Sequence, residues 1–164
     1  MVKTQYLETV YNALSEVMDP EIPVLSLVDL GVIVDVKLRK NDSVLVKMRP
    51  TFLGCPALEK MKEEVELKLI EIGFNIVEIE IVLSPAWTSD EISDHGRNAL
   101  REYGYAPPPK GGVIDDIEYL EYVQCPQCNG TNTELKSPFG PTLCRSIHYC
   151  HDCLESFQQI KPMR

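Results

Sequence analysis

The sequence has no long apolar run, few histidines and none of the common catalytic signatures. No stretch approaches the roughly 20 apolar residues that a membrane-spanning helix needs. Residues 1–8 also lack the apolar core of a secretory signal. The GxGxxG, P-loop, HExxH and GxSxG motifs are all absent. We therefore expect a cytoplasmic protein without a membrane partner, and no motif predicts an enzyme.

Positive charge is scarce as well. The chain has 164 residues, with 16 Lys and Arg against 25 Asp and Glu, which gives a net charge of −9. Residues 121–164 hold four basic and four acidic side chains, so the excess of acid lies entirely in the first 120 residues. An acidic surface repels phosphate backbones and anionic lipid. The charge therefore predicts no nucleic-acid partner.

Five of the six cysteines lie in the last 40 residues. Two CxxC pairs, Cys125/Cys128 and Cys150/Cys153, are separated by 21 residues. Each CxxC turn directs two thiolates to one point, and two such turns give the tetrahedral S₄ site that suits structural zinc. Rubredoxin-like iron or an iron–sulfur cluster on the same thiolates is the alternative. Cys144 is expected to pack as a small buried residue.

The chain is expected to form two parts. Residues 106–112 read Ala-Pro-Pro-Pro-Lys-Gly-Gly, which neither a helix nor a central strand tolerates. We therefore place a first domain at 1–105, a linker at 106–116 and a metal module at 117–164. The module is too small to build a self-sufficient core, so a metal is expected to stabilise it.

Apolar spacing in the first part predicts mixed helix and strand. Helices are expected at 4–17, 57–72 and 89–103, and strands at 31–38, 43–48 and 76–83. A hairpin at 40–42 would join the first two strands. The order α-β-β-α-β-α predicts an α/β (α+β) fold, a three-stranded sheet with packed helices. In the module, strand-like pieces at 131–136 and 145–149 predict a zinc-ribbon-like fold.

Two features of the first part could carry chemistry. Pro56 suits the first turn of a helix, which puts Cys55 at or next to the N-cap, where a thiolate is favoured. The alternative is an inert, buried cysteine. The turn Asp19-Pro20-Glu21 ends the first helix. Its carboxylates, taken alone, favour a solvated helix stop.

These residues resemble a known family. The runs 19–33 (DPEIPVLSLVDLGVI) and 50–57 (PTFLGCPA) are similar to the metal–sulfur cluster biosynthesis domain, also called the MIP or SufT type. Residues 84–90 (SPAWTSD), 100–104 (LREYG) and 139–144 (FGPTLC), with the final CxxC pair, resemble the PaaD (PaaJ) family of accessory subunits of the phenylacetyl-CoA ring epoxidase. Leu53 departs from the small polar residue expected before Gly54, which makes the surroundings of Cys55 more apolar.

The resemblance implies a non-catalytic maturation factor for this oxygenase in phenylacetate degradation. Cys55 would handle iron or an iron–sulfur cluster transiently, and Asp19 and Glu21 would lie nearby. The partner would be the reductase, which holds an iron–sulfur cluster, or the di-iron oxygenase subunit. Because one cysteine per chain cannot hold a cluster alone, a homodimer or a ligand from the partner is required. The alternative is a scaffolding subunit of the oxygenase complex that holds only structural zinc.

Overall fold

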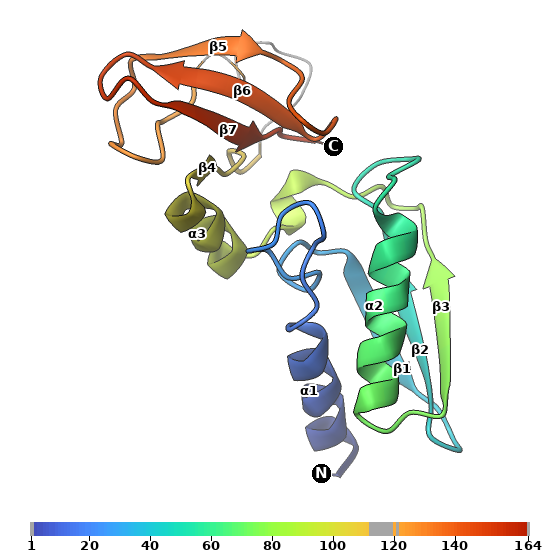
Figure 1. The fold of residues 1–164 in the computed structure, drawn as a ribbon. Helices are drawn as coiled ribbons and strands as arrows, with labels where there is room; N and C mark the ends of the chain where they lie inside the picture. Colours follow the sequence, from blue (N-terminus) through green and yellow to red (C-terminus); the bar gives the residue numbers. More distant parts are fainter. Residues whose placement is uncertain (1, 112–119, 121, 164) are drawn as a thin grey trace. The chain divides into compact units, whose positions relative to one another are not determined.

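The computed structural model describes residues 2–111, 120 and 122–163, and it divides into two compact units (Figure 1). The units are Met1–Trp87 and Thr88–Arg164. The division therefore comes before the predicted linker, because residues 105–106 pair with a strand of the second unit. Residues 112–116 of that linker lie outside the described residues. In the part of the chain that is described, no helix has the length and apolar character needed to cross a membrane.

The first unit is a three-stranded sheet with two helices (Figure 1). Its elements, in chain order, are α1 (Val2–Leu14), β1 (Ile33–Leu38), β2 (Ser43–Met48), α2 (Leu58–Glu71) and β3 (Ile76–Ile81). Strand β2 is central, with β1 antiparallel and β3 parallel to it. The predicted α+β class is confirmed, and the parallel β2–β3 pair makes α2 a crossover helix.

Local backbone chemistry fixes two turns of this unit. Asn41 and Asp42 both have positive φ, 59° and 51°, in the connection between β1 and β2. Such backbone matches the twist of paired strands and favours Asn and Asp, so the predicted hairpin forms. Gly73, at φ 106°, ends α2, because its amide bonds to the Ile70 carbonyl at 3.0 Å.

The core of the first unit lies between the helices and the sheet. Strand β2 is buried along most of its length, as expected of the central strand. The members that are at most 3% exposed, from α1, β2 and α2, are Val10, Leu14, Val44, Val46, Met48, Met61, Val65 and Leu69. The helical spacing of the apolar residues therefore identified the buried faces of both helices correctly.

Two helix boundaries differ from the prediction. Helix α1 ends at Leu14 rather than residue 17, but Val17 still bonds to the Leu14 carbonyl at 3.1 Å in a tighter turn and stays buried. The helix expected at 89–103 is split into a 3₁₀ turn, η1 (Ser89–Glu91), and α3 (Asp94–Tyr103). The Ser93 hydroxyl caps α3 by accepting from the Gly96 amide at 2.9 Å.

The second unit adds a four-stranded sheet after α3, in the order β4-β7-β6-β5. Strands β5 and β6 correspond to the predicted strand-like pieces, whereas β4 and β7 were not predicted. Strand β7 has two central glutamines and few apolar residues, so its place depends on backbone pairing with β6 rather than on a sequence pattern. The strands are β4 (Tyr105–Ala106), β5 (Thr133–Ser137), β6 (Arg145–Cys150) and β7 (Ser156–Ile160).

Candidate functional site: the Cys55 loop and a four-cysteine centre

Cys55 lies at the carboxyl end of the parallel strands β2 and β3, the edge of a sheet where binding sites commonly form. The connection between β2 and α2 carries it. Hydrogen bonds join this region to two neighbouring loops: the Arg49 amide donates to the Val32 carbonyl at 2.8 Å, and its side chain donates to the Pro85 carbonyl at 3.3 Å. Three loops therefore meet at the end of the sheet that holds Cys55.

The backbone around Cys55 forms a tight turn. Gly54 has φ 80°, a conformation that favours glycine, and an added Cβ would meet no atom within 4 Å. Glycine is thus required here by its dihedral angle and not by crowding. The Cys55 carbonyl accepts from the Leu58 amide at 3.2 Å, and Ala57 occupies the N-cap of α2. Cys55 lies two residues before this N-cap, slightly further from the helix than predicted.

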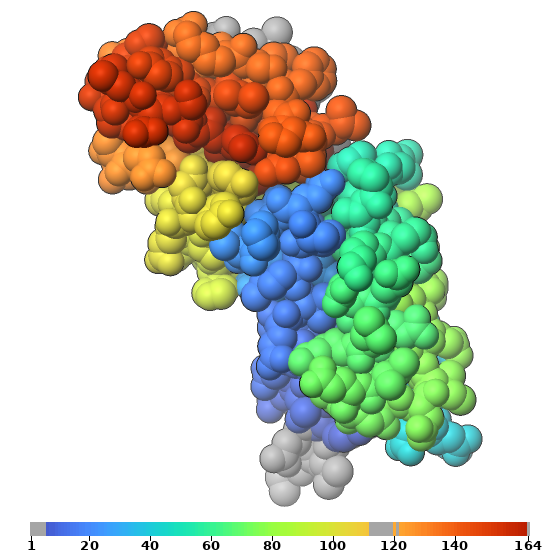
Figure 2. Space-filling view, in the orientation of Figure 1, coloured from blue at the N-terminus to red at the C-terminus, as the bar shows by residue number. Residues whose placement is uncertain are grey.

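The Cys55 side chain is partly exposed. The neighbouring Leu53 is 78% exposed, so it points largely to solvent and does not enclose the cysteine. In Figure 2 the blue-green segment around residues 50–60 lies at the surface of the first unit. An inert core cysteine, the alternative from the sequence, would be fully buried, and this one is not.

Asp19 is buried, and its carboxylate is hydrogen-bonded to the backbone. Asp19 is only 5% exposed, and its Oδ1 accepts from the amides of Glu21 and Ile22, both at 2.8 Å. These bonds close the turn that follows α1. The interpretation as a solvated helix stop is therefore incorrect for Asp19, whereas Glu21 is partly exposed.

The groove beside the acidic turn does not include Cys55. Asp19 lies on a groove of about 540 Å³ between residues 16–23 and α2, together with Lys60 and Lys68. Neither Cys55 nor Glu21 lines this groove. Asp19 supports the shape of the loop next to α2.

Trp87 links two loops of the first unit, and the sequence did not predict its hydrogen-bond partner. It is 3% exposed, and its indole Nε1 donates to the Leu30 carbonyl at 2.8 Å. The bond fixes the loop after β3 against the loop before β1. The only signal in the sequence was a single tryptophan in a polar loop, which predicts burial but not a partner.

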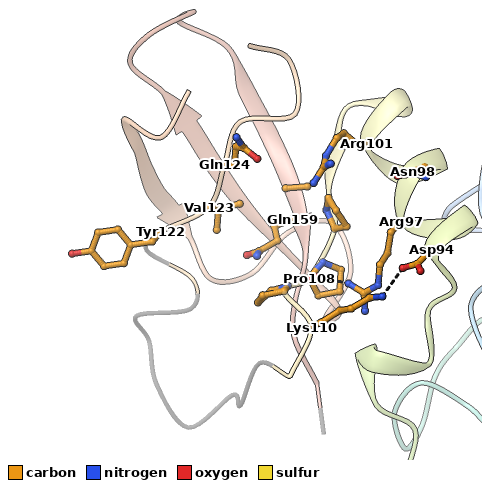
Figure 3. Close-up of a pocket in the computed structure, with 13 residues that line it drawn as sticks. Asp94, Arg97, Asn98, Arg101, Pro108, Lys110, Tyr122, Val123, Gln124 and Gln159 are labelled. Atoms are coloured by element: carbon orange, nitrogen blue, oxygen red, sulfur yellow. Dashed lines mark hydrogen bonds and ion pairs between the residues drawn. The ribbon is translucent and has the colours of Figure 1, made fainter. Parts of the chain in front are cut away.

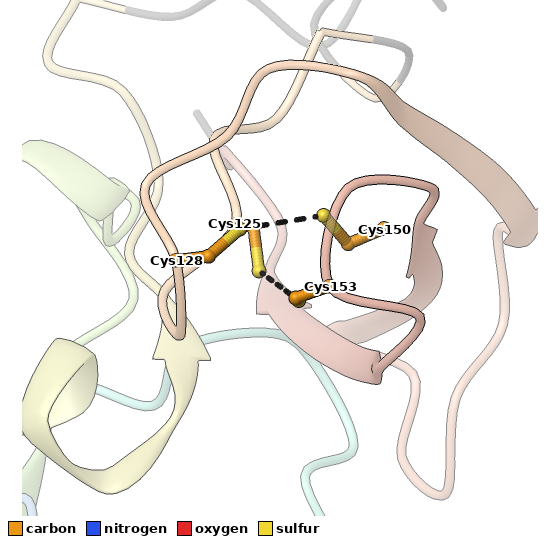
Figure 4. Close-up of side chains that lie close together, drawn as sticks. All are labelled: Cys125, Cys128, Cys150 and Cys153. Carbon is orange, nitrogen blue, oxygen red and sulfur yellow. Dashed lines mark hydrogen bonds between the residues drawn. The ribbon is translucent and has the colours of Figure 1, made fainter.

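The four cysteines of the second unit converge on one point (Figure 4). Their Sγ atoms all lie within 4.8 Å of one another. The Cys125–Cys153 and Cys128–Cys150 sulfur pairs are 3.7 and 3.6 Å apart. Among the described residues, no other group of three or more His, Cys, Asp and Glu side chains converges in this way.

The two CxxC turns have the same backbone design. The amide of the residue after each second cysteine, Asn129 or Leu154, donates to the carbonyl of the first cysteine at 2.9 Å. Both of these residues are left-handed, with φ of 61° and 64°. The amide of each first cysteine in turn donates to the carbonyl of the residue that follows, Gly130 or Glu155, at 2.9 Å. The metal position is therefore approached by two equivalent turns.

The spacing of the sulfurs fits zinc. A tetrahedron with Zn–S bonds of about 2.3 Å has sulfur–sulfur edges of about 3.8 Å, close to the two distances observed. Backbone amides favour the thiolate form of Cys150, because the amides of Cys153 and Asp152 lower its pKa to about 7, whereas burial and the neighbouring thiols raise the pKa of Cys128 and Cys153. The Gly130 amide donates to the Cys128 sulfur at 3.3 Å.

The other potential ligands of the module are engaged elsewhere. Cys144 is 8% exposed, as predicted for a small buried residue, and lies 3.1 Å from the Thr142 hydroxyl. His148 is fully buried, with Nε2 2.8 Å from the Ser146 hydroxyl. His151 lies 3.1 Å from the Glu134 carboxylate. A closed set of four thiolates leaves no open position for a reacting water.

Two family models match the chain, one in each part. Residues 7–81 match the family described as iron–sulfur cluster assembly protein. Residues 112–161 match the PaaD zinc beta ribbon domain. The first match spans the unit with Cys55, and the second includes all four clustered cysteines.

Curated proteins and a solved structure agree with this division. A protein of Escherichia coli strain K12, provisionally named as one of the subunits of 1,2-phenylacetyl-CoA epoxidase, is 36% identical over 152 residues, 93% of this chain and 90% of its own length. The Fe-S protein maturation auxiliary factor YitW of Bacillus subtilis is 33% identical over 57% of this chain and 91% of its own. The crystal structure of a DUF59 domain of unknown function from Bacillus anthracis matches with a TM-score of 0.53 and 28% identity, over 57% of this chain and 89% of that chain.

Fold and site together define a two-part protein, an iron–sulfur cluster assembly domain joined to a four-cysteine zinc ribbon. The chain belongs to the PaaD family, as its identity to the Escherichia coli relative over nearly the whole length shows.

Proposed function

We propose that this chain is a non-catalytic accessory factor that assists insertion of an iron–sulfur cluster or iron into a subunit of a phenylacetyl-CoA epoxidase. The name of the Escherichia coli relative supports the epoxidase as the recipient of the metal. The shorter relatives are named as Fe-S protein maturation auxiliary factors, which supports a role in maturation. The cluster or iron is cargo in this proposal.

The partly exposed thiol of Cys55 is the observation that carries the proposal. A transient ligand must be reachable by a second protein and held in a defined direction. The Gly54 turn and the Cys55–Leu58 hydrogen bond fix the backbone, while partial exposure leaves the sulfur accessible. Asp19 holds the turn after α1 from a buried position, and Glu21 offers a partly exposed oxygen donor on the same turn.

A single thiol cannot complete the coordination of iron. The missing ligands would come from the client or from Cys55 of a second copy. The zinc ribbon supplies no exchangeable position, because its four thiolates are closed on one point. Its role in the proposal is to fold the second unit and to dock the client.

The experiment uses cells that express the epoxidase subunits but lack this chain, complemented with wild type, Cys55→Ala or the control Cys144→Ala. Iron and acid-labile sulfide are measured in the purified reductase, and iron in the purified di-iron subunit. We expect Cys55→Ala to leave one of these subunits depleted and Cys144→Ala to restore it. Full metal content in both subunits with Cys55→Ala would refute the proposed role of Cys55.

The second candidate, a scaffolding subunit, is favoured by the closed metal site and the acidic first part. It predicts a stoichiometric complex with the oxygenase that survives purification and does not depend on Cys55. Size-exclusion chromatography of the co-expressed subunits, with wild type and Cys55→Ala, distinguishes the two. A lasting complex with both variants supports scaffolding, and its absence supports a transient factor.

A further inference from the structure

The second unit contains a large cavity that neither the cysteine centre nor the proposed function uses (Figure 3). Its volume is about 850 Å³, within the range of small-molecule sites. One wall is the face of α3 that carries Arg97 and Arg101, and residues 106–110 form a second wall. Residues 122–124 and Gln159 of β7 complete the lining.

The cavity is cationic in a chain with a net charge of −9. Arg97, Arg101 and Lys110 line it against a single carboxylate, Asp94, which leaves an excess of two positive charges. Asp94 contacts Lys110 at 2.5 Å, and this ion pair lowers the pKa of the Asp94 carboxyl. Arg101 makes no ion pair or hydrogen bond with the described residues.

Arg97 fixes the shape of this wall. It is only 8% exposed, and its guanidinium donates to the carbonyls of Ile92 at 3.2 Å, Ser89 at 2.6 Å and Pro108. Three of its five N–H groups are thus used on backbone, so it acts mainly as a fixed positive charge. Arg101 is the side chain with freedom to contact a ligand, and Lys110 could do so by exchanging Asp94 for the ligand.

The rest of the lining is apolar or neutral. Ala106, Val123 and three consecutive prolines line the cavity, and Tyr122, which is 83% exposed, lies at its edge with its ring directed away from the other lining side chains (Figure 3). The buried amide of Gln159 adds a polar group. A bare phosphate ion would fill only a small part of this volume. The lining therefore fits a molecule with a doubly charged anionic group and an uncharged body.

We propose that this cavity binds a phosphorylated small organic molecule, with Arg101 and Lys110 contacting the phosphate. Two positive charges match a dianionic phosphate better than a single carboxylate, and a guanidinium matches phosphate geometry with paired hydrogen bonds. The apolar segment 106–109 and Val123 would hold the organic part. The cavity is lined by residues of the second unit and Cys55 belongs to the first, so this inference does not rest on the proposed function.

The test is isothermal titration calorimetry on the zinc-loaded full chain, with ADP, adenosine and inorganic phosphate as probes. We expect ADP to bind more tightly than inorganic phosphate, adenosine to bind least, and ADP affinity to fall as salt rises. Arg101→Gln should weaken ADP binding about tenfold, the loss of one charged hydrogen bond, and Arg101→Lys should restore part of it. Arg101 is exposed and without a described partner, so the variant should fold.

Asp94→Asn gives a test in the opposite direction. It removes the carboxylate that competes for Lys110, so ADP should bind several-fold more tightly. The control Lys136→Gln removes a lysine of β5 that pairs with Glu134 and does not line the cavity, and it should change nothing. Cys55→Ala should bind ADP like wild type, which separates this result from the proposed function.

Two results would overturn the proposal. One is an absence of ADP binding at millimolar concentration, or binding that Arg101→Gln leaves unchanged. The other is Arg101-dependent binding of a hexaglutamate peptide without any binding of ADP, which would assign the cavity to an acidic protein segment instead.

Discussion

The two CxxC turns allow a reciprocal substitution that tests whether backbone strain is stored beside the metal. Asn129 and Leu154 occupy equivalent left-handed positions, with φ of 61° and 64°. Asparagine tolerates this conformation, whereas it costs a leucine about 1–2 kcal/mol. Leu154 is 69% exposed, so its replacement loses little burial. Leu154→Asn should therefore stabilise the second unit by about 1 kcal/mol, and Asn129→Leu should destabilise it by a similar amount.

The measurement is urea unfolding of both single variants and the double variant at saturating zinc, with protection of β6 amides from hydrogen exchange reporting on the second unit. A change of about 1 kcal/mol corresponds to a shift in Tm of about 4–8 °C for a unit of this size. The double variant should return to within about 0.5 kcal/mol of wild type. The strain hypothesis fails if both single variants shift stability in the same direction, or if Leu154→Asn is destabilising.

Three further predictions concern buried groups and the metal. Asp19→Ala should destabilise the first unit by about 2–4 kcal/mol, because two amides lose their acceptor, whereas Asp19→Asn keeps an oxygen and should cost less in the same urea titration. Cys150→Ser, or removal of zinc by a chelator, should abolish the cooperative unfolding of the second unit and leave the thermal transition of the first unit unchanged. Thermal melts followed by circular dichroism measure both transitions, and the loss of both would contradict this prediction. Burial lowers the pKa of His148 to about 4, below the value of about 6.5 in the unfolded chain, so the unfolded state binds the proton first and stability should fall as pH drops from about 6.5 towards 4. His148→Phe should flatten that slope at constant zinc content, and an unchanged slope would show that another group causes it.

The sequence predicted the first unit well because its signals are local. Val10 and Leu14 on α1, and Val65 and Leu69 on α2, are spaced four residues apart as on one face of a helix. Asn41 and Gly73 tolerate positive φ and lie in the connections that end elements. Such features depend on residues within one or two turns of each other.

The second unit was harder to predict because its strands depend on distant partners. Strand β7 has the sequence Ser-Phe-Gln-Gln-Ile, with no clear alternation, and forms by pairing with β6. Strand β4 has only two residues and directly precedes three prolines. The four-cysteine site was nevertheless predictable, since CxxC spacing alone sets the direction of both sulfur pairs.

For the candidate site of the first unit, residue types singled out Cys55 and Asp19 as candidates. They did not show that Asp19 would be buried with its oxygen on two backbone amides. The bond from Trp87 to the Leu30 carbonyl joins residues 57 positions apart, and no local pattern contains that information. Tertiary contacts of this kind decide which carboxylate is structural and which remains available.

The pairing of β4 with β7 determines how the protein should be divided in the laboratory. A fragment that begins at residue 117, after the proline segment, would keep all four cysteines but lose β4, and the outer edge of β7 would carry unpaired amides and carbonyls. Exposed strand edges promote self-association. A fragment that begins at Thr88 keeps this edge covered, so it is the better choice for studying the ribbon alone.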